Sequence, residues 1–191
     1  MLPVSFRDPF ARTPDPLGTV VVIPARFDST RLPGKPLADI GGSPMIAHVC
    51  RAAVRVVGVD AVVVATDDDR VMRAVEGTGA IGRMTASTHR TGTDRVAEVA
   101  AALNCEIVVN LQGDEPFVQP EMLHATIAPL HEDASLGMST VCCPITDDAD
   151  LTNPNVVKLV RDARGRALYF SRSPIPFVRG PRPTLLKHIG M

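Results

Sequence analysis

Short apolar runs alternate with amphipathic segments as far as residue 131, and this alternation constrains the fold more than any other feature. The apolar runs cover residues 19–23 (TVVVI), 61–65 (AVVVA), 106–111 (EIVVNL) and, more weakly, 80–84. Runs of β-branched residues without polar alternation are typical of strands buried on both faces of a sheet. Apolar residues at helical spacing predict helices over residues 44–57, 67–76, 93–103 and 120–131. Strands and helices in alternation indicate right-handed crossovers and a mostly parallel α/β sheet.

The pattern changes after residue 131. Residues 138–143 are predicted to form a strand, and residues 156–161 and 166–170 flank a turn-like segment at 162–165. Two such runs around a turn predict a small antiparallel hairpin, an edge or a lid beside the parallel sheet. We predict a single domain over residues 19–191.

Residues 1–18 contain four prolines and lack both the apolar region and the cleavage pattern of a secretory signal. They are predicted to form a disordered tail, and the protein is predicted to be cytoplasmic.

Composition excludes several classes of protein. With 45% hydrophobic and 21% charged residues, the chain is neither disordered, collagen-like nor a coiled coil. Twenty basic and 21 acidic side chains give a net charge of -1, which disfavours a dedicated nucleic-acid binder. No stretch approaches the roughly 20 apolar residues that span a bilayer, so no membrane association is expected. The four cysteines lack CxxC spacing and are predicted to be reduced, mostly buried thiols.

Ligands of open parallel sheets bind beyond the carboxyl ends of the strands, so the segments there are the candidate site. After the first strand, residues 24–36 (PARFDSTRLPGKP) combine three prolines with Arg26, Arg31 and Lys35. A stiffened loop with three cations can bind a polyanion, although a solvated basic loop is the alternative. The pattern GxxxxGK[ST] is missing, so the loop is not a Walker A motif.

Three further strands end in polar segments. Residues 66–69 (TDDD) could attract a metal ion, but acids in the first turn of a helix explain them better. Residues 88–95 are rich in hydroxyls and donors and open a helix, which suits the edge of a small polar ligand; the alternative is a helix start capped by Thr93. In residues 110–116, Gly113 permits close approach and Asp114 can hold a divalent ion that also touches phosphates; the alternative is a tight turn.

A glycine pattern and the histidines are the other sequence features with a possible functional meaning. Residues 77–82 match GxGxxG, but they close a helix and enter a strand, so they are interpreted as capping and turn glycines with no dinucleotide cofactor. Among the histidines, His89 and His188 are in polar contexts that could face a ligand, whereas His48 is interpreted as a core residue.

Taken together, these segments resemble the bacterial 3-deoxy-D-manno-octulosonate (KDO) cytidylyltransferases, or CMP-KDO synthetases. The resemblance runs from about Val20 to the last residue and rests on VVIPARFDSTRLPGKPL, VVVATDD, HRTGTDR, VVNLQGDEP, NPNVVK, ALYFSRSPIP and KHIG. It implies a three-layer, Rossmann-like nucleotidyltransferase that needs Mg²⁺. The implied reaction is CTP plus KDO giving CMP-KDO plus diphosphate, for lipopolysaccharide biosynthesis.

The resemblance also implies roles for individual residues. Arg26, Lys35 and Asp114 would be catalytic, with Arg26 and Lys35 on the CTP phosphates and Asp114 on the metal. Arg172 and His188 would contact the sugar acid. HRTGTDR and Gln112 would surround cytosine and ribose. The implied nucleotide contacts are Pro24, Ala25, Arg26, Lys35, Thr66, Asp67, Arg90, Thr91, Gly92, Gln112 and Asp114.

The family continues for several dozen residues beyond KHIG, into further substrate contacts, a second metal-binding Asp and much of a homodimer surface. We therefore expect a C-terminally shortened copy that binds CTP, turns over KDO poorly and does not form a clean dimer. The alternatives are a cytidylyltransferase for 8-amino-KDO or sialic acid, of which QGDEP disfavours the latter, and an inactive nucleotide-binding module.

Overall fold

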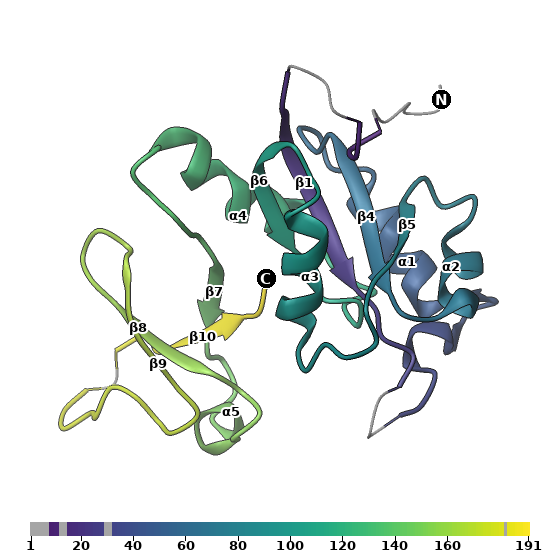
Figure 1. Ribbon diagram of the computed structural model, residues 1–191. Helices are drawn as coiled ribbons and strands as arrows, with labels where there is room; N and C mark the ends of the chain where they lie inside the picture. Colours follow the sequence, from purple (N-terminus) through teal and green to yellow (C-terminus); the bar gives the residue numbers. More distant parts are fainter. Residues whose placement is uncertain (1–7, 12–14, 29–31, 182) are drawn as a thin grey trace. The chain divides into compact units, whose positions relative to one another are not determined.

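The computed structural model describes residues 8–11, 15–28, 32–181 and 183–191 (Figure 1). The chain divides into two compact units, one ending at Leu136 and the other beginning at Gly137. The single domain expected over residues 19–191 stays a prediction. Most of the expected N-terminal tail, and Arg31 of the basic loop, lie outside the described residues. The described Phe10 packs against the core of the first unit, and the Arg83 guanidinium lies 4.6 Å from the centre of its ring.

The first unit is built on a parallel sheet with strand order β5-β4-β1-β6. Its strands are β1 (Leu17–Pro24), β4 (Ala61–Thr66), β5 (Ile81–Met84) and β6 (Cys105–Asn110). The two central strands are fully buried between residues 20 and 23 and between residues 61 and 65, which confirms the prediction for both runs. The third run behaves differently. On β6, an outer strand of this sheet, half-buried and exposed residues alternate from Cys105 to Val108, and Val109 is the buried residue of the strand.

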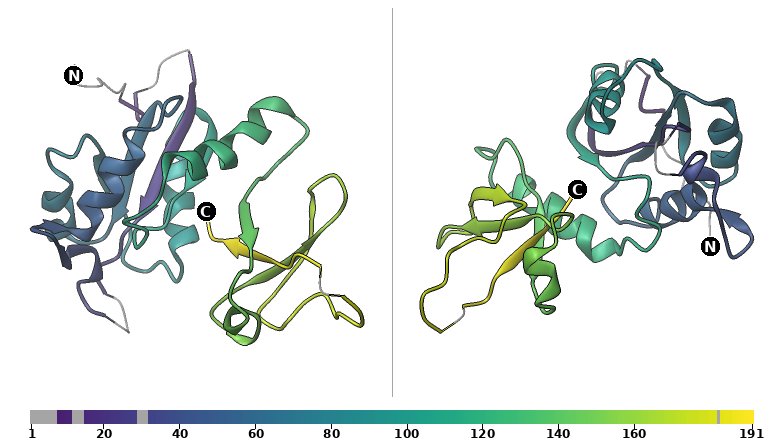
Figure 2. Two further views of the ribbon diagram at one scale, coloured as in Figure 1. Left: turned by 180° about the vertical axis from the view of Figure 1, so that it is seen from behind. Right: turned by 90° about the horizontal axis from the view of Figure 1, so that it is seen from below.

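Helices cover both faces of this sheet, with α3 on one face and α1 and α2 on the other (Figures 1 and 2). Alternate residues of β1 and β4 form a core cluster with Val96 and Val99 of α3. The four helices are α1 (Met45–Ala53), α2 (Asp69–Val75), α3 (Gly92–Ala100) and α4 (Pro120–Glu132). The 3-10 helix η1 (Lys35–Leu37) and the short pair β2 (Asp39–Ile40) and β3 (Ser43–Pro44) lead into α1. None of the helices in the described ranges is long and apolar enough to cross a membrane.

Two predicted helix starts need correction. Pro44 occupies the N-cap of α1 with extended backbone instead of its first turn. Thr91, and not Thr93, caps α3, because it forms a reciprocal capping box with Asp94. The Thr91 hydroxyl accepts from the Asp94 amide at 3.1 Å, and the Asp94 carboxylate accepts from the Thr91 amide at 3.0 Å. Hydrogen bonds to the Asp94 carboxylate from the side chain and from the backbone amide of Thr91 lower the pKa of Asp94.

The glycine pattern at 77–82 and the histidine in α1 follow the predictions. Gly77 and Gly79 lie between α2 and β5 with φ of 73° and 88°, as expected for turn glycines. The His48 ring nitrogen Nε2 is 2.8 Å from the Ile40 carbonyl, so it is a satisfied structural histidine.

The second unit holds an antiparallel sheet with strand order β7-β10-β8-β9. Its elements are β7 (Val141–Pro144), α5 (Ala149–Thr152), β8 (Lys158–Arg161), β9 (Ala167–Ser171) and β10 (Leu186–Ile189). The expected hairpin is confirmed as β8–β9. Its turn is closed by the Asp162 carboxylate, which accepts the Arg164 and Arg166 amides at 2.8 Å each.

All four cysteines are free, as predicted, but the expectation that most are buried is wrong. Only Cys50 is fully buried, and burial raises the pKa of its thiol to about 12. The other three lie on strands that are only half-buried.

Candidate functional site

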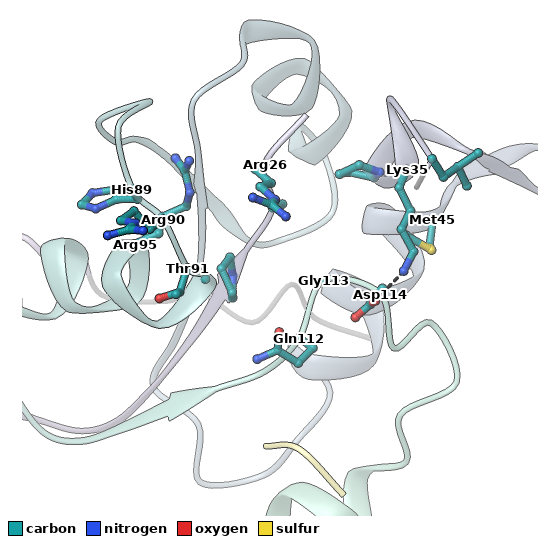
Figure 3. A pocket seen from close by; sticks show the side chains of 15 residues that line it. Arg26, Lys35, Met45, His89, Arg90, Thr91, Arg95, Gln112, Gly113 and Asp114 are labelled. Atoms are coloured by element: carbon teal, nitrogen blue, oxygen red, sulfur yellow. Dashed lines mark hydrogen bonds and ion pairs between the residues drawn. The ribbon is translucent and has the colours of Figure 1, made fainter. Parts of the chain in front are cut away.

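A pocket of about 460 Å³ opens where the strands of the parallel sheet reach their carboxyl ends (Figure 3). All of its lining residues belong to the first unit. They come from the segment after β1, from the start of α1, from the segment that opens α3 and from the segment after β6. The pocket is therefore at the edge of the sheet where the sequence predicts a ligand site.

Two glycines let these segments approach one another. A Cβ atom on Gly113 would lie 2.7 Å from the Pro24 carbonyl oxygen, closer than real Cβ atoms come to other heavy atoms. A Cβ on Gly92 would lie 3.2 Å from Cγ of Pro24. The end of β1 is thus packed against both the segment after β6 and the start of α3. Larger residues at either position would push the walls of the pocket apart.

Lys35 and Asp114 meet inside the pocket. The Lys35 ammonium is 2.5 Å from Oδ2 of Asp114, and both side chains are partly exposed, at 38% and 47% (Figure 3). Lys35 is the first residue of η1, whereas Asp114 follows β6, so the pair bridges two walls. The neighbouring Glu115 has a raised pKa, because it is partly buried and next to the Asp114 charge.

His89, Arg90 and Arg95 gather at the opposite side of the pocket in Figure 3. Arg95 is only 2% exposed, and its guanidinium donates to Oδ2 of Asp67 at 2.6 Å and to the Thr85 hydroxyl. His89 pairs with Glu98, which also accepts the Ala86 amide at 3.0 Å, and these contacts lower the pKa of Glu98. A charged, donor-rich wall of this kind can bind a polar, anionic ligand.

Most of the predicted nucleotide contacts line this one pocket. They are Pro24, Ala25, Arg26, Lys35, Arg90, Thr91, Gly92, Gln112 and Asp114. Thr66 and Asp67 are not among the lining residues. The Thr66 carbonyl accepts from Thr85 through the amide at 2.8 Å and the hydroxyl at 2.9 Å, and Asp67 binds Arg95.

The pocket also contains His89 and Arg95 of HRTGTDR, the segment that the resemblance places around cytosine and ribose. Four lining residues were not predicted as nucleotide contacts: Leu32, Pro36, Met45 and Gly113. Among them, only Gly113 carries a signal in the sequence, because a glycine after a strand permits close approach. Met45 carried no such signal, because its spacing fits the apolar face of α1. Leu32 and Pro36 flank the predicted cations in the same loop.

The predicted sugar-acid residues belong to the second unit. Arg172 donates to the Pro154 carbonyl at 2.5 Å, and the Arg172 carbonyl accepts from Lys158 at 2.7 Å. His188 lies on β10, 2.8 Å from the Thr140 hydroxyl, and its ring meets Phe170 edge-on at 5.0 Å. Burial lowers the pKa of His188.

Asp114 is the metal ligand expected from the resemblance. No group of three or more His, Cys, Asp or Glu side chains that could hold a metal ion occurs in the part of the chain that the structure describes. Magnesium does not require such a cage, because it is commonly held by one or two carboxylates together with substrate phosphates and water. One partly exposed carboxylate beside cationic phosphate-binding candidates fits that mode of binding.

Comparison with known proteins identifies the family. A model described as cytidylyltransferase matches residues 20–190. The chain belongs to the cytidylyltransferase family.

Among characterised cytidylyltransferases, the 3-deoxy-manno-octulosonate cytidylyltransferase of Geobacter sulfurreducens is 53% identical over 163 residues. That alignment covers 85% of this chain and 65% of the relative. The corresponding protein of Chromohalobacter salexigens is 48% identical over 184 residues, covering 90% of this chain and 71% of the relative. The chain thus spans slightly less than two thirds of the length of the first of these relatives.

Comparison with solved structures agrees with this family assignment. The solved structure of a CMP:2-keto-3-deoxy-manno-octonic acid synthetase complexed with CTP matches with a TM-score of 0.87 and 46% identity. The match covers 91% of this chain and 72% of that structure. The predicted α/β fold, with a mostly parallel sheet and a small antiparallel one, is therefore confirmed.

Proposed function

We propose that the pocket of the first unit binds CTP and that the chain acts in the activation of KDO. The reaction is CTP plus 3-deoxy-D-manno-octulosonate giving CMP-KDO plus diphosphate, for lipopolysaccharide biosynthesis. The observation that carries the proposal is the meeting of Lys35 and Asp114 in one pocket with Arg26 and Gln112. The likeness to a synthetase solved with CTP supports it.

Phosphoryl-group chemistry of this type depends on charge neutralisation and positioning more than on a covalent nucleophile. Arg26 and Lys35 supply donors for the triphosphate from one proline-stiffened loop. Gln112 and the segment Arg90–Gly92 supply the neutral and cationic donors for ribose and cytosine. Because Gly92 and Gly113 have no side chains, the segments that carry these donors pack closely together.

Lys35 and Asp114 are proposed to change ionic partners when the triphosphate binds. Without nucleotide, each group neutralises the other. When the triphosphate enters, Lys35 transfers its ammonium hydrogen bond to a phosphate oxygen, and the Asp114 carboxylate becomes free to hold Mg²⁺. Bound magnesium supplies Lewis-acid polarisation of phosphate oxygens and a lowered pKa for the attacking hydroxyl.

The remaining parts of the proposal rest on the resemblance. Arg172 and His188 of the second unit are proposed to contact the KDO carboxylate and hydroxyls. A cytoplasmic location is part of the proposal. The homodimer that the resemblance implies for the family is not proposed for this chain. The substrate 8-amino-KDO remains the nearest alternative, since no residue of the first unit's pocket separates it from KDO.

The test is calorimetric titration of CTP together with an assay for diphosphate release with and without KDO. Asp69→Asn is the matched control for Asp114→Asn, because Asp69 is an exposed carboxylate on α2 outside the pocket. We expect wild type and Asp69→Asn to bind CTP in the presence of magnesium, and Asp114→Asn to bind it more weakly. CTP binding without KDO-dependent release supports the nucleotide-binding module instead, and the absence of CTP binding contradicts the proposal.

A further inference from the structure

The ring of Phe27 lies at the base of the basic loop, in contact with Gly34 of the same loop and with Arg70 of α2. The Arg70 guanidinium carbon is 3.4 Å from the centre of the ring. A Cβ on Gly34 would lie 3.2 Å from Cζ of the same ring, so the backbone there packs closely on it. Gly34 also has φ of 72°, a conformation that favours glycine. Neither Phe27 nor Arg70 lines the pocket.

Arg70 is held over the ring by Asp68, the N-cap of α2. Oδ1 of Asp68 accepts from the amide of Arg70 at 2.8 Å and from its Nε at 2.9 Å, and Oδ2 accepts from Nη2 at 2.6 Å. The hydrogen bonds from Arg70 lower the pKa of Asp68 to about 2. The pair therefore stays charged across the whole physiological pH range, and the guanidinium plane has a fixed orientation.

The backbone of Phe27 is fastened as well. Its amide donates to Oδ1 of Asp67 at 3.4 Å, and the other oxygen of Asp67 accepts from the buried Arg95. Its carbonyl accepts the Gly34 amide at 3.0 Å, which closes the loop between residues 27 and 34.

Lys35 follows directly on this closure. Its amide donates to the Leu32 carbonyl at 3.1 Å, and the Leu37 amide donates to Gly34 at 2.8 Å, so the backbone under Lys35 forms a hydrogen-bonded turn. A lysine side chain is flexible, and the entropy lost when it binds a ligand falls if its backbone is already fixed. The residues that fix the Phe27 ring therefore determine the position from which the Lys35 side chain extends into the pocket.

We propose that Phe27 and Arg70 are positioning residues that fix Lys35 for binding the triphosphate. Asp67 and Asp68, which follow β4, then act on the nucleotide indirectly. Asp67 holds the backbone of Phe27, and Asp68 holds the Arg70 guanidinium over the Phe27 ring. This inference rests on the proposed function, because it assigns a purpose to the Lys35 side chain that only a phosphate ligand gives it.

A double-mutant cycle tests the inference on the whole chain. Arg70→Met and Phe27→Leu are each made alone and together with Lys35→Ala, and dissociation constants for CTP and for cytidine are measured by calorimetry. Arg73→Met is the control, since Arg73 is an exposed arginine of the same helix outside the contact. The melting temperature of every variant is recorded, and Arg70→Lys tests whether a cation without the planar stack suffices.

We expect Arg70→Met and Phe27→Leu to weaken CTP about 3- to 10-fold, with cytidine affinity unchanged, because cytidine lacks the phosphates. In the Lys35→Ala background the same substitutions should have no further effect. Arg70→Lys should recover only part of the loss, and Arg73→Met should resemble wild type.

Equal losses with and without Lys35, equal losses for CTP and cytidine, or no loss at all would overturn the positioning role while leaving CTP binding intact. A wild-type chain that binds no CTP overturns the proposed function itself, and the positioning role with it. The two failures are therefore distinguishable in one set of titrations.

Discussion

The Lys35 ammonium lies 2.5 Å from the Asp114 carboxylate, although 79 positions separate the two residues in the sequence. One comes from the loop after β1 and the other from the end of β6. Strands β1 and β6 are hydrogen-bonded neighbours, with Val20 paired to Val108, so their carboxyl ends meet at one edge of the sheet. The contact joins the proposed phosphate-binding lysine to the proposed metal-binding carboxylate within one pocket.

Asp114→Asn should remove most of the diphosphate release while leaving the fold nearly unchanged. The substituted side chain is 47% exposed and keeps its size, so its removal costs little packing. Loss of the carboxylate that would hold Mg²⁺ should cost roughly 3–5 kcal/mol of barrier lowering, or about 10²–10⁴ in rate. The measurement is turnover at saturating magnesium, alongside a thermal melt. Unchanged turnover would remove Asp114 from the site.

Gly113→Ala should weaken CTP binding and lower stability. Its Cβ would meet the Pro24 carbonyl oxygen at 2.7 Å, so the segment after β6 must move away from β1. We expect a loss of about 1–3 kcal/mol in the free energy of unfolding, as for other overpacked sites. Gly137→Ala is the control, because nothing lies within 4 Å of its added Cβ. Denaturant titration compares the two variants, and equal stability would contradict the close approach.

The second unit should lose stability as the pH falls below about 6.5. Burial lowers the pKa of His188 in the folded state, so between the folded and the unfolded pKa the unfolded chain binds more protons. The stability that depends on the neutral ring is therefore complete above the unfolded value of about 6.5 and is lost as the pH drops through the folded pKa.

Tyr169 makes this measurable, since it is the only tyrosine, the chain has no tryptophan, and the residue lies on β9 of the second unit. Tyrosine fluorescence during denaturant unfolding at several pH values reports on that unit. His188→Gln should flatten the dependence, whereas His124→Gln, an exposed residue of α4, should retain it. A wild-type profile without a slope in this range would contradict the burial effect.

The sequence predicted which helices and strands exist better than it predicted where they end and what they contact. The run at 61–65 could be predicted as a buried strand because it is short and contains three consecutive valines, and β-branched residues favour strands. The partial exposure of β6 was not predicted, since the composition of a strand does not reveal whether it is central or at the side of a sheet. Thr91 and Thr93 both fit an N-cap, and only the reciprocal bond to Asp94 decides between them.

For the pocket too, the lining residues were easier to predict than the contacts between side chains. The places of Arg26, Lys35 and Asp114 in the pocket could be predicted because each belongs to a segment that follows a strand of the parallel sheet. The pairing of Asp67 with Arg95 could not, because it joins two segments 28 positions apart across α2 and β5. Such a contact depends on how far each helix carries the chain before it returns. The role of Asp67 as a support for Phe27 is likewise visible only in three dimensions.

The most direct test of the account is the affinity of the chain for CTP, compared between wild type, Lys35→Ala and Arg73→Ala. Charge-assisted bonds to phosphate typically contribute about 1.5–3 kcal/mol, so Lys35→Ala should raise the dissociation constant roughly 10- to 150-fold. Arg73→Ala removes an exposed cation outside the pocket and should leave the constant unchanged. Equal affinity in all three proteins would contradict the assignment of this pocket as the triphosphate site.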